Sequence, residues 1–135
     1  MSVCVLDSSA WVSSVVAGDE RGERVLATLE TFHEWWAPDA FDLEVLSALR
    51  GHLLRGLLSA GELHRQAVAL VELPLQRIST RTLLSRIASL APSVSTYDAA
   101  FVALAELLDA PLLTTDSRLA RAPGPRCEFL LVEDN

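Results

Sequence analysis

The chain has 135 residues, half of them hydrophobic and 21% charged, which indicates one folded domain rather than a disordered chain. Its formal net charge of −7 argues against broad, nonspecific DNA binding, because that binding depends on clustered cations. No run approaches the roughly 18 apolar residues of a membrane helix, and no basic leader precedes Arg21, so a cytoplasmic protein without a membrane segment is expected.

The first half of the chain predicts short strands alternating with helices. The apolar run at residues 3–6 predicts a buried strand, and a helix is expected over residues 9–16. Apolar residues recurring every three or four positions predict a second helix over about residues 20–33. The segment EWWAPD predicts a strand closed by Pro38, and Asp39 is placed to cap a third helix that reaches about Leu58.

The second half continues the same alternation. Ser59 and Glu62 have the spacing of a capping box, which opens a helix that Pro74 ends. Residues 75–79 predict a marginal strand, helices are expected over 80–90 and 96–108, and strands over 112–115 and 129–132. Strands alternating with helices predict an α/β domain with a largely parallel central sheet.

Two of the predicted strands end on a carboxylate. Asp7 follows the first apolar run, and Asp116 follows Thr114 at the end of a later one. In open α/β sheets, ligands bind outside the carboxyl ends of the strands, so a shared site is expected there. The alternative is that each Asp only caps the following helix, although neighbouring serines could take that role instead.

Two helices offer further acids. Asp98 leads the apolar stripe of the helix over 96–108 instead of lying on its polar face. The alternative role for Asp98 is to stabilise the helix N-terminus, with Ser95 as the capping residue. In the third helix Glu44 shares a face with small residues, whereas Asp42 shares its face with apolar ones, so Glu44 is the favoured site residue.

If the four acids converge, their mutual repulsion must be relieved by protonation or by a divalent cation. Ligand sets made only of oxygen atoms suit Mg²⁺ or Mn²⁺. Such a site activates water and stabilises the charge that develops on a phosphodiester during in-line attack. One metal ion and two remain equally open.

Three stretches contain these acids: VLDSSAWV, APDAFDLEVLSALR and STYDAAFVALAELLDAPLLTTDSRLARA. In this order they resemble the PIN-domain family, and specifically the VapC-type ribonuclease toxins of bacterial toxin–antitoxin pairs. The resemblance covers residues 1–135 and implies a single PIN domain, a three-layer α/β/α fold with a central, largely parallel sheet of about five strands. It also implies an acidic quartet around Mg²⁺ or Mn²⁺, formed by Asp7, Glu44, Asp98 and Asp116.

The resemblance implies roles for individual residues as well. Asp7 and Asp98 match the positions most often assigned as metal ligands. Thr114 matches the hydroxyl residue of the TxD motif, which would orient a carboxylate or the attacking water. Arg118 and Arg121 stand beside this motif and are expected to hold phosphates, the alternative being stabilisation of a helix C-terminus.

The implied function is metal-dependent cleavage of RNA by water, in a cytoplasmic homodimer that is inhibited by a cognate antitoxin protein. A catalytically silent PIN domain that only binds RNA or a protein partner is the alternative, and a DNA-directed nuclease is the nearer enzymatic one. The absence of Lys argues against a phosphoacceptor receiver domain and a P-loop, and Ser9 stands where a dehalogenase-type phosphatase needs a second Asp. Cys4 and Cys127 are expected to be small buried side chains, and the three Trp to pack in the core or at an interface.

Overall fold

The computed structural model describes residues 2–134, and its centre is one parallel sheet. The strand order is β3-β2-β1-β4-β5, and each neighbouring pair is parallel. The predicted α/β class with a parallel sheet is therefore confirmed. The strands are β1 (Val3–Leu6), β2 (Glu34–Pro38), β3 (Leu75–Ile78), β4 (Leu112–Thr114) and β5 (Phe129–Leu131).

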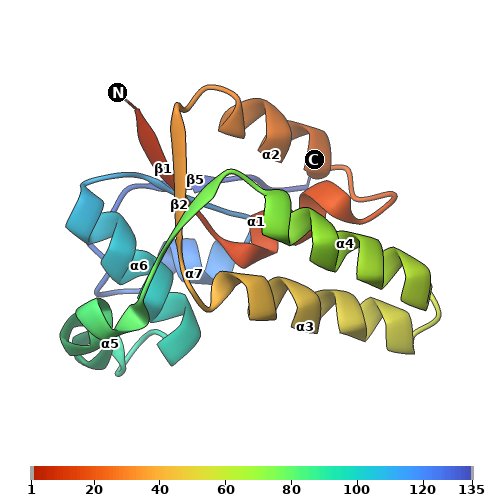
Figure 1. Cartoon of the computed structure of the whole chain (residues 1–135). Coiled ribbons are helices and arrows are strands. Elements are labelled where there is room, and N and C mark those ends of the chain that lie inside the picture. Colours follow the sequence, from red (N-terminus) through yellow and green to blue (C-terminus); the bar gives the residue numbers. More distant parts are fainter. Residues whose placement is uncertain (1, 135) are drawn as a thin grey trace.

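Helices cover both faces of this sheet. Figure 1 shows α1 to α4 on one side of the strands and α5 and α6 on the other. Right-handed crossovers require this change of face, because the chain moves outward from β1 to β3 and then returns across the sheet to β4. None of the helices in residues 2–134 is long and apolar enough to cross a membrane. The helices are α1 (Ser8–Val15), α2 (Gly22–Leu29), α3 (Phe41–Leu54), α4 (Ala60–Glu72), the 3₁₀ turn η1 (Thr80–Leu83), α5 (Leu84–Leu90), α6 (Thr96–Leu108) and α7 (Ser117–Arg121).

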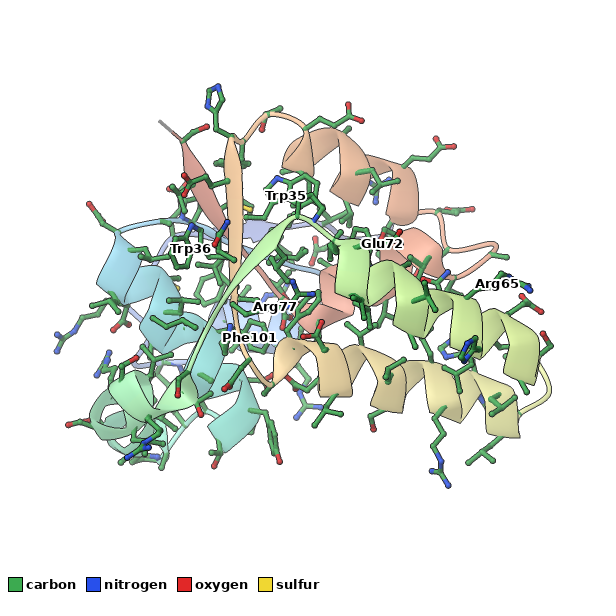
Figure 2. The ribbon with its side chains drawn as sticks, viewed as in Figure 1. Trp35, Trp36, Arg65, Glu72, Arg77 and Phe101 are labelled. Atoms are coloured by element: carbon green, nitrogen blue, oxygen red, sulfur yellow. The ribbon has the colours of Figure 1, made fainter. Side chains whose placement is uncertain are left out.

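The core lies where α6 packs against the central strands. Every residue of α6 from Ala99 to Ala105 is buried, and Phe101 lies beneath β2 in Figure 2. Trp35 and Trp36 project from opposite sides of β2 and pack against this core. Core packing was one of the two roles expected for the tryptophans. Their indole N–H groups donate to Leu29 O and to Glu34 Oε1, both at 2.9 Å, so their polar atoms are satisfied.

Two predicted helix starts are confirmed in detail. Ser59 and Glu62 form the reciprocal capping box at the start of α4. Ser95 is the N-cap of α6, and its hydroxyl accepts a hydrogen bond from the backbone N–H of Asp98 at 3.4 Å. Residue 98 therefore lies in the first turn of a helix that the core fixes in place.

Several predicted boundaries are wrong by a few residues. The second helix starts only at Gly22, because Asp19 and Arg21 hold a turn before it through two side-chain hydrogen bonds. The third helix ends at Leu54, close to Gly56, whose φ of +75° lies in the left-handed region. Asp39 does not cap this helix: Ala40 occupies the N-cap position, and the backbone N–H of Asp39 donates to Ile78 O of β3.

Gly22 marks a close approach between α1 and α2. A Cβ added there would lie 2.7 Å from the backbone oxygen of Ser13, whereas one added at Gly51 in α3 would meet nothing within 4 Å. Gly22→Ala is therefore expected to lower the free energy of unfolding by about 1–3 kcal/mol through overpacking. Gly51→Ala, the matched control, is expected to raise it by about 0.5–1 kcal/mol through helix propensity. Urea denaturation measures both, and equal effects would contradict the close approach.

Candidate active site

The candidate site lies where the strand order reverses. Strands β2 and β4 flank β1, so the carboxyl ends of β1 and β4 lie side by side at the switch point where α/β sheets bind ligands. The backbone N–H of Asp7 donates to Leu113 O at 2.9 Å and continues the ladder past the end of β1. Asp7 and Thr114 are therefore neighbours although they stand far apart in the chain.

Asp7 is held in one orientation by two hydroxyl groups. Its side chain is only 3% exposed, and its Oδ2 accepts from Thr114 Oγ1 at 2.7 Å and from Ser9 Oγ at 2.6 Å. The Thr114 hydroxyl in turn accepts from the backbone N–H of Asp116 at 3.0 Å. Thr114 thus orients Asp7 and ties it to the Asp116 segment, while Asp7 Oδ1 makes no hydrogen bond within residues 2–134.

Ser9 was missed as a site residue from the sequence, where it was considered as an alternative helix cap and as evidence against a dehalogenase-type phosphatase. Its hydroxyl donates to Asp7 and accepts from the backbone N–H of Thr115 at 3.3 Å, so it joins the ends of β1 and β4. The position of Ser9 could have indicated this role. Ser9 lies two residues after Asp7 in the first turn of α1, and side chains in a helix point back toward its N-terminus, here toward the end of β1.

Asp116 also caps a helix. Its Oδ1 accepts from the backbone N–H groups of Arg118 and Leu119 at 3.0 and 3.2 Å, so the capping alternative is confirmed for this residue. Asp7 makes no such side-chain cap on α1. Capping engages one carboxylate oxygen of Asp116 and leaves Oδ2 without a hydrogen bond among the described residues.

Glu44 and Asp98 come from helices on opposite faces of the sheet. Glu44 lies in the first turn of α3, and its Oε1 is buried with no hydrogen-bond partner in the described part of the chain. Such an atom calls for a ligand or a proton. Asp98 lies in the first turn of α6, and its side chain is half-buried.

The four acids form one electrostatic cluster. Burial raises the pKa of Asp7 to about 6, against the effect of its two hydroxyl donors and with help from the charges of Asp98 and Asp116. Burial raises the pKa of Glu44 to about 7, and the charges of Asp7 and Asp98 add to it. The pKa of Asp98 is also raised, first by burial and then by Asp116. Negative charge is therefore unfavourable at several neighbouring positions at once.

The cluster fits a hard divalent cation in charge and in donor type. Within residues 2–134, no three His, Cys, Asp or Glu side chains lie close enough together to hold a metal ion as they stand. The donors of the cluster are carboxylate oxygens. Glu44 Oε1 is buried without a hydrogen-bond partner among the described residues, and both side-chain hydrogen bonds to Asp7 go to Oδ2, so Oδ1 is left for an ion. Glu44 and Asp98 are only half-buried, so their side chains have room to turn toward an ion.

Two cavities open on either side of the cluster. One, of about 540 Å³, lies between α1 and α3 and includes Glu44 in its lining. The other, of about 500 Å³, is lined by Asp98, Asp116 and Arg118, among others. The positive charge of Arg118 acts on Asp98 by lowering its pKa, against the larger effect of burial. The cluster therefore has open space on both sides.

Two other charged residues lie away from the cluster. Arg121 pairs with Glu133 at 3.4 Å on the surface and lines neither cavity. Asp42 forms a two-pronged ion pair with Arg77, both contacts at 2.9 Å, and Figure 2 shows Arg77 between β3 and the start of α3. Sequence periodicity placed Asp42 among apolar residues, but its charge is neutralised by an arginine from a neighbouring strand.

Comparison with known proteins identifies the family. The family model described as PIN domain matches residues 4–125. The chain belongs to the PIN-domain family. This PIN domain is 37% identical over 131 residues to "Ribonuclease VapC12" of Mycobacterium tuberculosis, covering 95% of the chain and 98% of the relative. It is 40% identical over 137 residues to "Ribonuclease VapC1" of the same species, covering 98% and 99%.

Solved structures share the fold of this PIN domain. A structure described as a toxin–antitoxin complex from Klebsiella pneumoniae matches with a TM-score of 0.68 at 14% identity, over 98% of this chain and 99% of that one. Mycobacterium tuberculosis VapC20, described as a sarcin–ricin loop cleaving toxin, matches with a TM-score of 0.67 at 16% identity, over 87% and 92%. The expected three-layer PIN fold is confirmed.

Proposed function

We propose that this PIN domain is a metal-dependent endoribonuclease that acts as the toxin of a bacterial toxin–antitoxin pair. The observation that carries the proposal is the cluster of four acids at the switch point, with Asp7 held by two hydroxyls and Glu44 Oε1 left without a partner. The full-length likeness to proteins named ribonucleases supports RNA as the substrate. The fold shared with a toxin–antitoxin complex supports an antitoxin as the partner.

The four acids would hold Mg²⁺ or Mn²⁺, with Asp7 and Asp98 as its main ligands. A bound divalent ion supplies an activated water and neutralises charge on the scissile phosphate. Thr114 and Ser9 keep Asp7 in the orientation that this task requires. Arg118 is placed to hold a phosphate beside Asp98 and Asp116, since it is exposed and lines their cavity.

The remaining roles are part of the same proposal. Arg121 would contact the RNA farther from the cluster, after release from its exposed pair with Glu133. The protein would act in the cytoplasm as a homodimer, and the antitoxin would cover the cluster until it is removed. No protein nucleophile takes part, because water attacks the phosphodiester directly.

Asp98→Asn tests the proposal. The variant keeps the shape of the side chain and removes one ligand charge, so we expect a folded protein with cleavage reduced at least 100-fold. Purified protein free of antitoxin is incubated with mixed tRNA and ribosomal RNA in Mg²⁺, in Mn²⁺ and in excess EDTA. We expect the wild type to cleave RNA in Mg²⁺ or Mn²⁺ and not in excess EDTA. Full activity in folded Asp98→Asn would disprove the proposed site, and cleavage of DNA alone would reassign the substrate.

A further inference from the structure

The cavity between α1 and α3 has a mixed lining, of which the proposed metal site uses only Glu44 and Ser9. One part consists of apolar side chains, Val12 and Val16 of the α1 segment. His52 and Glu44 project from α3 on the opposite side. The volume of about 540 Å³ lies within the range of small-molecule sites, roughly 300–1,000 Å³. The remaining polar lining is rich in hydroxyl groups, from Ser8, Ser9, Ser13, Ser47 and Thr115.

The charges in this cavity do not suit a phosphate group. Arg21 belongs to the lining, but its guanidinium already makes two hydrogen bonds to Asp19, at 3.0 and 2.8 Å. The guanidinium of Arg21 is therefore already neutralised by Asp19, and Glu44 adds a further acid to the lining. The cavity on the other side of the cluster differs, because Arg118 lines it and makes no ion pair within residues 2–134. A phosphate is therefore better placed beside Arg118, and an uncharged group between α1 and α3.

Hydroxyls beside an apolar wall suit a nucleoside. A base offers flat apolar faces and a polar edge, and a ribose offers hydroxyls that donate and accept. Val12 and Val16 can contact a base face, while the hydroxyls of Ser8 and Ser47 can bond to the base edge or the ribose. Glu44 joins this lining to the acid cluster, so a nucleoside here would adjoin the cleavage point.

His52 is the side chain in the lining best suited to bind a base. Glu44, Ala48 and His52 are spaced four residues apart and lie on one face of α3, so His52 lies two turns from the cluster. Its Nδ1 lies 3.0 Å from Ala48 O, which places the proton on Nδ1 and leaves Nε2 free for a ligand. A histidine ring can also stack on a base.

We infer that the cavity between α1 and α3 is a subsite for the nucleoside next to the scissile phosphate, with His52 as a substrate-binding residue. The inference deepens the proposed ribonuclease function and rests on it. The RNA strand then runs from Arg118, across the four acids, into this cavity. Binding of one base beside the cleavage point gives the site a means of choosing where a strand is cut.

A binding experiment tests the subsite independently of catalysis. AMP, GMP, CMP and UMP are each titrated, without metal, into ¹⁵N-labelled protein while the imidazole resonances are followed by NMR. We expect the resonances of His52 to shift with at least one nucleotide and those of exposed His33, at the amino end of β2, to stay in place. No shift at His52 with any of the four would overturn the subsite, whatever the cleavage assay gives.

Filling the cavity provides the matched pair of variants. Ala48 is exposed in the lining, so Ala48→Phe occupies the cavity without disturbing the core, whereas Ala69→Phe places the same ring on the exposed face of α4. We expect Ala48→Phe to abolish the nucleotide-induced shifts and Ala69→Phe to retain them. On RNA, Ala48→Phe and His52→Gln are expected to raise KM about tenfold with kcat within about threefold, and His33→Gln to change neither.

The outcomes separate the two proposals. Shifts at His52 in a protein that cleaves no RNA would leave the nucleoside subsite standing and refute the ribonuclease function. If the wild type cleaves RNA and Ala48→Phe cleaves it with the same KM, the subsite is refuted and the ribonuclease function stands. A loss confined to kcat in His52→Gln would also refute the subsite, because it would assign His52 to the chemical step rather than to binding.

Discussion

Asp7→Asn is expected to abolish RNA cleavage and, at the same time, to stabilise the metal-free protein at neutral pH. The native environment raises the pKa of Asp7 from 3.8 to about 6, mainly through burial. The charged form is therefore less favourable in the folded protein than in the unfolded chain. As pH rises from about 4 to about 6, the unfolded chain loses its proton first, and the free energy of unfolding falls. Asn carries no charge, so the variant avoids this loss.

The stability gain is expected to be about 1–3 kcal/mol at pH 8 in EDTA, and to vanish at about pH 3, below the unfolded pKa of 3.8, where the carboxyl group is mostly protonated in both states. Urea denaturation at the two pH values measures it. Asp39→Asn, at an exposed position outside the cluster, is the control and is expected to change neither stability nor cleavage. Mg²⁺ is expected to stabilise the wild type more than Asp7→Asn. Lower stability of Asp7→Asn at pH 8 would show that the charge contributes favourably to the fold.

Thr114→Val is expected to reduce cleavage about 10–100-fold and to lower the free energy of unfolding by about 1–3 kcal/mol. Valine has the shape of threonine but lacks the hydroxyl that donates to Asp7 and accepts from the Asp116 backbone N–H. Asp7 then loses one of its two side-chain donors, and the Asp116 N–H loses its partner. A displaced Asp7 carboxylate explains the lower activity, because small errors in position have large effects on rate.

Thr114→Ser is the matched control, because serine keeps the hydroxyl and removes only a methyl group. We expect activity within about threefold of wild type and a stability loss near 1 kcal/mol, the value for one buried methyl group. Cleavage rates with saturating Mg²⁺ and urea midpoints measure both variants. Equal loss of activity in the two variants would mean that packing around residue 114, and not its hydroxyl, positions Asp7.

The acids at the strand ends could be placed from the sequence because their positions follow from a rule of topology. Parallel strands bring their carboxyl ends to one edge, so Asp7 and Asp116 meet once the strands are recognised. Asp98 was readable from its place at the head of a buried stripe, with Ser95 as the cap. Glu44 required only a choice between faces of one helix.

Contacts between distant segments could not be read in the same way. The Asp42–Arg77 pair joins a helix to a strand that stands 35 residues later, and no local pattern records it. Arg121 stands beside the TxD motif in the sequence, yet its partner Glu133 follows β5. The predicted helix boundaries were wrong for a related reason. The turn made by Asp19 delays the start of α2, and the left-handed backbone of Gly56 follows the end of α3, although the apolar periodicity continues past both points.

The hydrogen bond between Asp7 and Thr114 spans 107 residues of the chain and closes the centre of the sheet. When a ribosome has made β1, β2 and β3, the chain still lacks Asp98 and Asp116. Thr114 and Thr115, which donate hydrogen bonds to Asp7 and Ser9, are missing as well. If the complete chain is the proposed ribonuclease, the nascent chain cannot cleave the RNA around it, the ribosome's own included, until nearly all of the chain has emerged. Under the proposed function, toxicity starts only with the completed molecule, and an inhibitor can be made during the time that synthesis takes.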